Sequence, residues 1–256
     1  MGAHRTTRLP PDWQATPDAL RDRVVLVTGA GGGLGRATAL AAANSGAQVI
    51  LLGRKVPQLE KVYDSVAALG RMQPAIYPMD LSGATPKDYF DLAETIAREF
   101  GRLDGIVHAA AHFESLRAAS GIAADEWERS LHVNVSAPFL LTQASSALLA
   151  QAADASVVFV LDDLDRVSRA HWGGYGVSKH ALGALASILH DEWDNTSVRV
   201  HTALPPPMRT ALRRAAYYGE NTMQLPTPEE FAPAIVYLLS SAGATARGSV
   251  LDLRAE

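Results

Sequence analysis

Short apolar runs alternate along this chain with longer segments in which apolar residues recur every three or four positions. The short runs are typical of buried strands, and the longer periodic segments are typical of amphipathic helices. The runs predict strands at residues 24–28, 47–52, 74–78, 103–108, 156–161, 198–204 and 249–253. The periodic segments predict helices at residues 36–44, 56–69, 86–100, 124–151, 175–193 and 228–240.

This alternation indicates the class and layout of the fold. Strands separated by helices of about ten or more residues form βαβ units, whose strands are parallel and whose helices cover both faces of the sheet. The expected fold is therefore α/β, a single doubly wound parallel sheet of about seven strands. In such sheets a ligand binds beyond the carboxyl ends of the strands, where the strand order reverses.

The first eighteen residues lack this pattern. Arginines and prolines occur there without periodicity, which predicts an arm that is either mobile or draped over the fold. The rest of the chain shows neither an internal repeat nor a linker long enough to divide it. We expect an arm at residues 1–18 and a single domain at residues 19–256.

Composition restricts the classes of protein to consider. Hydrophobic residues make up 48% and charged residues 20% of the 256 residues, and the net charge is -4, so the chain can bury a core and has no bulk attraction for nucleic acid. Without cysteine it has no disulfide, thiolate nucleophile or cysteine metal site. No apolar run approaches the roughly 20 residues that span a bilayer, and the N-terminus lacks a signal-peptide core. We expect a cytoplasmic protein that binds a small molecule and neither nucleic acid nor a membrane.

The glycine-rich stretch after the first expected strand carries the clearest chemistry. Residues 28–35 read TGAGGGLG, between a strand and a helix. Glycine suits such a turn because backbone N–H groups can approach a pyrophosphate only where no Cβ intervenes, and the helix dipole then favours the anion. We expect a nucleotide cofactor here, with contacts from Thr28, Gly29, Gly33, Leu34 and Gly35.

Two later strand ends indicate which nucleotide binds. A carboxylate at the end of the second strand would bind the ribose 2′-OH and repel a 2′-phosphate, but this chain has Arg54 and Lys55 there. The two cations favour NADP(H), whereas the alternative is a pair of solvated charges. Asp80, at the end of the third strand, is expected either to accept a hydrogen bond from the adenine amine or to cap the next helix.

A second candidate group follows the fifth strand. Tyr175 and Lys179 are four residues apart, on one face of the expected helix. A tyrosine pKa of about 10 is too high for easy proton exchange at neutral pH, and a nearby ammonium ion lowers it by stabilising the phenolate. Such pairs also occur on ordinary helix surfaces, but here the position after a strand of a nucleotide-binding sheet favours a general acid and base.

Three motifs in this order resemble the signature of the short-chain dehydrogenase/reductase superfamily. They are TGAGGGLG at residues 28–35, Asn134 within NVSA, and YGVSK at residues 175–179. The resemblance covers roughly residues 23–253. It implies a seven-stranded Rossmann-type sheet, a homodimer or homotetramer, and hydride transfer between a nicotinamide and a carbonyl or alcohol.

The same resemblance implies roles for individual residues. Tyr175 would be the proton donor, and Lys179 would bind the nicotinamide ribose and lower the tyrosine pKa. Asn134 would hold a water molecule in the proton relay. The glycines that would approach the pyrophosphate are Gly29, Gly33 and Gly35.

Four positions depart from the family pattern. The family usually carries a serine twelve or thirteen residues before the tyrosine, but thirteen residues before Tyr175 this chain has Asp162, with Asp163 beside it. The turn after strand four, usually Asn-Asn-Ala-Gly, reads HAAA at residues 108–111. After strand six, three prolines replace Pro-Gly, and Met208 stands where a threonine often holds the carboxamide of the cofactor. The last two changes remove hydrogen bonds to the nicotinamide half.

Asp162 separates the functional hypotheses. An ionised carboxylate repels a developing alkoxide but attracts a protonated imine or an aminated heterocycle. Pteridine reductases, a branch of the superfamily, carry an aspartate at this spacing and an aromatic residue after strand four, where this chain has Phe113. The alternatives are that Asp162 belongs to a solvated loop and that Phe113 is core. Trp172, just ahead of Tyr175, is expected to shape the pocket wall.

Other features rank lower. His108, His112 and His171 would have to gather to bind a metal, and we expect no metal site. Residues 208–225 are basic and aromatic, and they lie where the family keeps a mobile substrate lid; a solvated helix face is the alternative.

The sequence therefore predicts an NADP(H)-dependent oxidoreductase acting on a small carbonyl or imine. Tyr175, Lys179, Asn134 and Asp162 form its catalytic set, and Phe113, Asp162 and Trp172 contact substrate. The alternatives are a pteridine-like C=N reductase and a catalytically silent nucleotide-binding member kept for regulation or partnering.

Overall fold

One eight-stranded parallel sheet forms the centre of the fold. A computed structural model of the chain describes residues 5–254. The sheet order is β1-β8-β7-β6-β5-β2-β3-β4. The strands are β1 (Thr6–Thr7), β2 (Val24–Thr28), β3 (Gln48–Gly53), β4 (Ala75–Pro78), β5 (Gly105–His108), β6 (Ala155–Val160), β7 (Val198–Leu204) and β8 (Val250–Asp252). The predicted α/β class and parallel sheet are confirmed.

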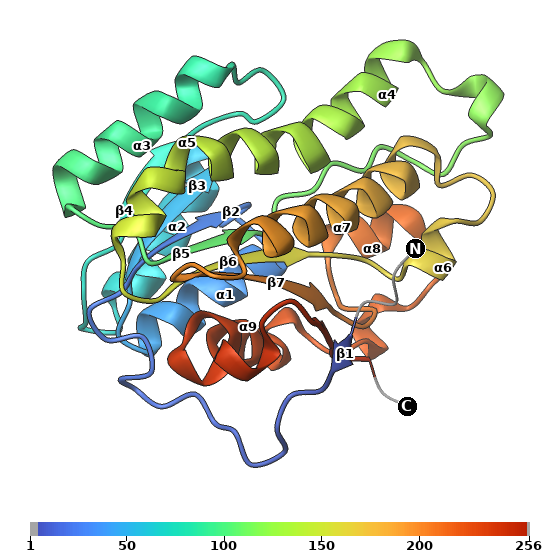
Figure 1. The fold of residues 1–256 in the computed structure, drawn as a ribbon. Helices are drawn as coiled ribbons and strands as arrows, with labels where there is room; N and C mark the ends of the chain where they lie inside the picture. Colours follow the sequence, from blue (N-terminus) through green and yellow to red (C-terminus); the bar gives the residue numbers. More distant parts are fainter. Residues whose placement is uncertain (1–4, 255–256) are drawn as a thin grey trace.

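Helices cover both faces of this sheet, with α3, α5 and α7 on one side and α1 and α9 on the other (Figure 1). The α-helices are α1 (Gly33–Asn44), α2 (Val56–Ala67), α3 (Pro86–Phe100), α4 (Ala124–Leu131), α5 (Ala137–Gln151), α6 (Leu164–Val167), α7 (Gly173–Trp193), α8 (Ala211–Ala216) and α9 (Ala232–Leu239). Shorter helical turns are η1 (Ala119–Gly121), η2 (His132–Ser136), η3 (Thr222–Gln224), η4 (Pro228–Glu230) and η5 (Ser241–Ala246).

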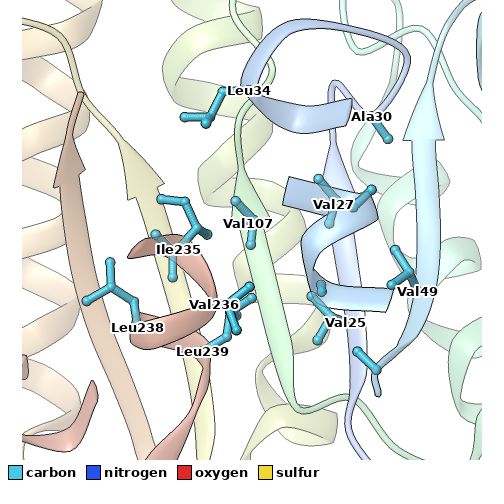
Figure 2. Close-up of a cluster of buried hydrophobic side chains, with 14 of the residues drawn as sticks. Val25, Val27, Ala30, Leu34, Val49, Val107, Ile235, Val236, Leu238 and Leu239 are labelled. Carbon is cyan, nitrogen blue, oxygen red and sulfur yellow. The ribbon is translucent and has the colours of Figure 1, made fainter. Parts of the chain in front are cut away.

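Strand periodicity divides the core into two layers. Successive side chains of a strand point to opposite faces, so Val25 and Val27 join one cluster, whereas Val24 and Leu26 join the other. Figure 2 shows the first layer, where side chains of β2, β3 and β5 meet those of α9. Both faces of the central strands are buried, which explains why their sequences are continuous apolar runs.

The strand order reverses between β2 and β5. From β2 the chain builds outward to β3 and β4, then returns to place β5 on the other side of β2. The crossover loops therefore diverge at the carboxyl ends of these two strands and leave a crevice there. The glycine-rich turn follows β2, and the loop carrying Asp162 follows β6, next to β5.

The eighth strand lies in the segment expected to be an arm. Thr6 pairs with Val250, so β1 extends the sheet beyond β8. Farther along the arm, the ring of Trp13 packs edge-on against Tyr237, with 5.4 Å between ring centroids. A two-residue edge strand is held by backbone hydrogen bonds and leaves no periodic signal, which is why seven strands were expected.

The expected helix at residues 124–151 is continuous but not uniform. It runs through α4, the π-helical turn η2 and α5, and it packs against α3 and α7. By length and composition this helix is apolar enough to cross a membrane, yet half of its most apolar window is buried inside the fold, as in a core helix. The π-helical turn carries Asn134.

Candidate active site

A cleft of about 440 Å³ opens at the carboxyl ends of the strands. At one end it is lined by the glycine-rich turn, Arg54 and Asp80, and at the other by Asp162, Tyr175 and Lys179. The residues that the sequence assigned to cofactor and to chemistry thus share one cavity. Helix α1 starts at Gly33, so its first N–H groups, which have no intrahelical partner, face this space.

The glycine turn is shaped to receive an anion. Gly29 and Gly33 have φ angles of 68° and 52°, a left-handed conformation that favours glycine. Gly32 lines the cleft, and a Cβ placed on it would meet nothing within 4 Å, so the cradle is open at this point. Leu34 also lines the cleft. These residues fit a dinucleotide pyrophosphate.

Two residues of the motif stand behind this cradle. Thr28 and Gly35 are not among the described residues that line the cleft. The Thr28 hydroxyl donates to Val107 O at 3.3 Å and accepts from Ala110 N at 3.1 Å, which ties the β2 turn to the β5 loop. A Cβ on Gly35 would collide with the carbonyl oxygen of Gly29, so Gly35 permits close packing of the helix against the turn. Their position predicts support for the cradle rather than direct contact.

Arg54 lies exposed at the rim of the cleft. Within residues 5–254 it forms no ion pair, so its guanidinium can receive a phosphate. Asp80 also lines the rim, and its Oδ1 accepts hydrogen bonds from the Ser82 backbone N–H at 3.0 Å and hydroxyl at 2.7 Å. These bonds hold the pKa of Asp80 below its ordinary value. The helix-capping alternative for Asp80 is wrong, because Thr85 caps α3.

Asp162 is bonded directly to Tyr175. The tyrosine hydroxyl donates to Asp162 Oδ2 at 2.7 Å, and the Arg166 guanidinium forms an ion pair with Asp162 Oδ1. The Asp162 side chain is only 13% exposed, so the solvated-loop alternative is wrong for it. Its neighbour Asp163 has a structural place: its carboxylate caps α6 and pairs with Arg254 at 2.9 Å.

Close packing of two helices brings these groups together. A Cβ on Gly176 of α7 would collide with the carbonyl oxygen of Val167 at the end of α6, so glycine allows α6 to lie directly against α7. Asp162 and Arg166 are four residues apart across the start of α6, and the carboxylate that pairs with Arg166 also accepts the Tyr175 hydroxyl. The carboxylate thirteen residues before Tyr175 therefore bonds the tyrosine hydroxyl directly.

The pKa of Tyr175 beside Lys179 shifts in the opposite direction to the one expected from the sequence. Burial raises the pKa of Tyr175 well above 10, the charge and hydrogen bond of Asp162 raise it further, and Arg166 partly opposes them. Lys179 donates to Val160 O at 2.9 Å, and its Nζ lies 5.7 Å from the centre of the Tyr175 ring. Burial lowers the pKa of Lys179 to about 8, against the attraction of Asp162. The expected lowering of the tyrosine pKa by Lys179 is therefore wrong for this arrangement.

Asn134 connects two segments of the site through hydrogen bonds of its side-chain amide. Its Oδ1 accepts from His112 N at 2.7 Å, and its Nδ2 donates to His112 O and to Ser178 Oγ, each at 2.9 Å. The residue is buried, and these bonds link the β5 loop to α7. Its role in holding a water molecule stays a prediction.

The aromatic residues form a wall beside Tyr175. Phe113 lies edge-on to Tyr175 with 5.4 Å between ring centroids, and it contacts Trp172 at 5.6 Å. Trp172 is 5% exposed and packs behind the tyrosine. Phe113 lines a second, more polar pocket that shares Arg54, Asp80 and His112 with the main cleft. Substrate contacts by Phe113 and Trp172 stay predictions, and the wall positions the Tyr175 ring.

The structure adds residues that the sequence did not single out. Arg166 lines the cleft, although only its spacing from Asp162 could have indicated it. Thr210 also lines the cleft, and its methyl lies 3.7 Å from where a Cβ on Gly33 would stand. A threonine thus faces the cofactor end two residues after Met208, which is buried beside it.

The three histidines do not gather. His108 is buried, stacks on Phe159 and contacts the Thr142 hydroxyl at 2.8 Å, and burial lowers its pKa to about 3. His112 lies 3.3 Å from Glu114, whereas His171 is exposed. In residues 5–254 no three His, Asp or Glu side chains are grouped to hold a metal ion.

Comparison with known proteins gives the family. The sequence profile of the short chain dehydrogenase family matches residues 23–221. The uncharacterized oxidoreductase YciK of Escherichia coli K12 is 35% identical over 240 residues, covering 94% of this chain and 95% of YciK. A protein from Pseudomonas syringae described as a short chain dehydrogenase has a TM-score of 0.91 and 39% identity, covering 95% of this chain and 99% of its own.

A second solved structure carries a cofactor. It is a protein from Escherichia coli CFT073 described as a short chain dehydrogenase complexed with NADPH, with a TM-score of 0.89 and 36% identity. The alignment covers 94% of this chain and all of that one. The chain therefore belongs to the short chain dehydrogenase family, and the resemblance carried by the three motifs is confirmed.

Proposed function

We propose that this short chain dehydrogenase is an NADP(H)-dependent oxidoreductase that passes hydride between the nicotinamide and a small carbonyl or imine substrate. The observation that carries the proposal is the shared cleft, in which the Tyr175 hydroxyl and Lys179 lie at the far end from an open glycine cradle. A nucleotide held by the cradle extends toward the tyrosine, which is a proton donor.

The choice of NADP(H) is supported by charge at the rim. Arg54 follows β3 at the rim of the cleft, where its charge would attract an adenosine 2′-phosphate, and β3 ends without a carboxylate that would repel that group. The Escherichia coli CFT073 neighbour was crystallised with NADPH, which supports the same choice. The bound cofactor supplies the hydride.

The protein's own groups handle the proton. In reduction, Tyr175 turns its hydroxyl from Asp162 Oδ2 to the substrate heteroatom and donates the proton. Lys179 and Arg166 are the cations next to the phenolate that remains, while the Asp162 carboxylate opposes it. Asp162 therefore makes proton donation to an alkoxide harder than a serine would.

The Asp162–Tyr175 bond specifically favours a second candidate, reduction of a C=N bond as in pteridine-like reductases. A protonated imine or aminated heterocycle can donate its N–H to Asp162 Oδ2, and its positive charge offsets the carboxylate. The largely covered Asp162 side chain, which is 13% exposed and bonded to the Tyr175 hydroxyl, supports this candidate.

Assembly and location complete the proposal. The long helices carry exposed apolar side chains, with Phe139 of α5 40% and Ile188 of α7 55% exposed. We place a homodimer or homotetramer interface there, in a cytoplasmic protein. Light scattering of the purified chain tests it: a monomer at micromolar concentration would contradict the assembly.

Two measurements test the function. NADPH is expected to raise the melting temperature more than NADH at equal concentration, because a ligand that binds only the folded state stabilises it. NADPH oxidation is then followed with ketones, quinones, imines and dihydropteridines. Turnover of at least one class is expected; tight NADPH binding with no turnover in any class would instead establish the catalytically silent alternative.

A further inference from the structure

Arg166 makes an unusual number of contacts for a residue at the edge of a cleft. Its guanidinium pairs with Asp162, donates to the Tyr217 hydroxyl at 3.1 Å, and lies over two aromatic rings. Those rings are Trp172, 5.1 Å from the guanidinium carbon, and Tyr217, at 5.8 Å. Its side chain is 27% exposed. Burial alone would lower the pKa of Arg166, but Asp162 and Tyr217 outweigh it and raise that pKa.

Tyr217 belongs to a different part of the chain. It ends helix α8 in residues 208–225, which we name the cover segment because Met208, Thr210 and Leu212 of this segment line the cleft. A second arginine packs against the Tyr217 ring. The guanidinium carbon of Arg213 lies 3.7 Å from the centre of that ring, and the guanidinium group forms an ion pair with Glu220 within the segment. Tyr217 is thus held between one arginine of its own segment and one from the Asp162 loop.

The two arginines differ in the segments that they connect. Arg166 joins Tyr217 to Asp162, and Asp162 in turn accepts the Tyr175 hydroxyl, so a continuous chain of contacts runs from the cover segment to the proton donor. Arg213 stacks on the same ring and lines the same cleft, but its partners stay inside the cover segment. Planar guanidinium groups suit such combined stacking and ion pairing, and a lysine does not reproduce both.

We propose that Arg166 is a positioning residue that holds the Asp162 carboxylate against the Tyr175 hydroxyl, and that Tyr217 links its position to the packing of the cover segment over the cleft. When the cover segment is packed, Tyr217 fixes Arg166, and Arg166 fixes the carboxylate. When the segment moves away, Arg166 loses a hydrogen bond and one stacked ring, and the carboxylate is less well held. The acceptor of the resting Tyr175 hydroxyl is therefore held in one position when the cleft is covered.

This inference rests on the proposed function, but its main test does not need turnover. Tyrosine is isotopically labelled at the ring carbon that bears the hydroxyl, and the Tyr175 resonance is assigned with Tyr175→Phe. Arg166→Gln is expected to move this resonance, because the Tyr175 hydroxyl loses its fixed acceptor. Tyr217→Phe keeps the ring but not the hydroxyl, and is expected to move the resonance in the same direction by less.

Two matched variants separate positioning from general loosening. Arg169→Gln removes the same charge from an exposed residue of the same loop, and is expected to leave the resonance unchanged. Arg213→Gln loosens the other side of Tyr217 but leaves the Arg166–Asp162 ion pair in place, so it is expected to move the resonance in the same direction by much less than Arg166→Gln does, while raising KM. If Arg213→Gln moves the resonance as far as Arg166→Gln, or if Arg166→Gln does not move it, the proposal is overturned.

Kinetics with an imine or dihydropteridine that is turned over provides the second readout, because the Asp162 carboxylate is expected to assist that reaction and to oppose carbonyl reduction. Arg166→Gln is expected to lower kcat by about 100-fold, as misplacement of reacting groups does, with a smaller change in KM. Tyr217→Phe is expected to lower it by about tenfold, for the loss of one hydrogen bond to a charged group. Arg166→Lys keeps a charge for Asp162 and should recover part of the kcat, and it carries the test if Arg166→Gln does not fold.

The two proposals fail in different ways. If no substrate is turned over but the Tyr175 resonance moves as expected, the oxidoreductase proposal fails and the positioning role of Arg166 is supported. If turnover is found and Arg166→Gln lowers only the melting temperature, with kcat, KM and the resonance unchanged, Arg166 is structural and this inference is overturned.

Discussion

At one end of the cleft, a single turn of the chain, residues 31–34, lines the cavity and begins helix α1, whose first N–H groups lack intrahelical partners. At the other end, the connected groups are side chains from separate segments: Asp162 after β6, Arg166 in α6, Tyr175 in α7 and Tyr217 after α8. The first end depends on backbone conformation, which glycine allows. The second depends on charges whose position is fixed by packing, so a single substitution there is expected to act on chemistry rather than on binding.

The largest expected effect is at the side-chain end. Tyr175→Phe removes the proton donor and should lower kcat by about 100- to 10,000-fold, the usual contribution of a positioned acid. NADPH affinity, measured by fluorescence titration, should change little because the phosphate cradle is intact. An equal loss of NADPH affinity would show that the two ends are not separable.

The backbone end is tested by two glycines. Gly32→Ala meets nothing within 4 Å in the free protein, so stability should be kept while NADPH affinity falls about tenfold or more as the new methyl fills the cradle. Gly35→Ala collides with the Gly29 carbonyl and should lower the free energy of unfolding by about 1–3 kcal/mol. Urea unfolding and cofactor titration measure both. The reverse pattern would place the pyrophosphate elsewhere.

A smaller effect is expected at the rim. Arg54→Ala should weaken NADPH by about tenfold, for the loss of a charge-assisted hydrogen bond, and leave NADH unchanged. Lys55→Ala is the matched control. Among the described residues, Arg54 lines the cleft and Lys55 does not. Equal losses for both cofactors would remove the argument for the 2′-phosphate.

The smallest expected effect is a pH dependence. The pKa of Lys179 is about 8, so this lysine is charged below that pH and neutral above it. The kcat/KM for NADPH, which reports groups of the free enzyme, should therefore fall by about fivefold as the pH rises through 8. The pKa of Tyr175 lies well above 10, so tyrosine ionisation does not contribute in this range. Lys179→Arg stays charged, and a profile with the same fall in this variant would exclude Lys179 as the cause.

The same contrast explains what could be read from the sequence. The parallel sheet, the glycine turn and the Tyr175–Lys179 spacing follow from contiguous residues, and they were predicted. The edge strand β1 and the π-helical turn at Asn134 depend on backbone bonds that leave no periodic pattern. The bond from Tyr175 to Asp162 could be suspected from spacing alone, but the pairing of Arg166 with Tyr217, 51 residues away, could not.

The direction of the Tyr175 pKa shift gives the same lesson. The sequence places a lysine one helical turn from the tyrosine, and the expected result was a lowered pKa. Burial and the Asp162 carboxylate dominate instead, and the lysine donates its hydrogen bond to the Val160 carbonyl. A local motif therefore identifies which groups meet but does not fix the sign of their electrostatic coupling.

The central claim is that Asp162 is part of the proton-transfer site and determines which substrates are reduced. Its most direct test is to compare NADPH oxidation by the unsubstituted chain and by Asp162→Ser with a matched ketone and imine. The account predicts that Asp162→Ser loses imine reduction and gains ketone reduction, because the carboxylate no longer attracts the cationic substrate or repels the alkoxide. Unchanged rates with both substrates would contradict it.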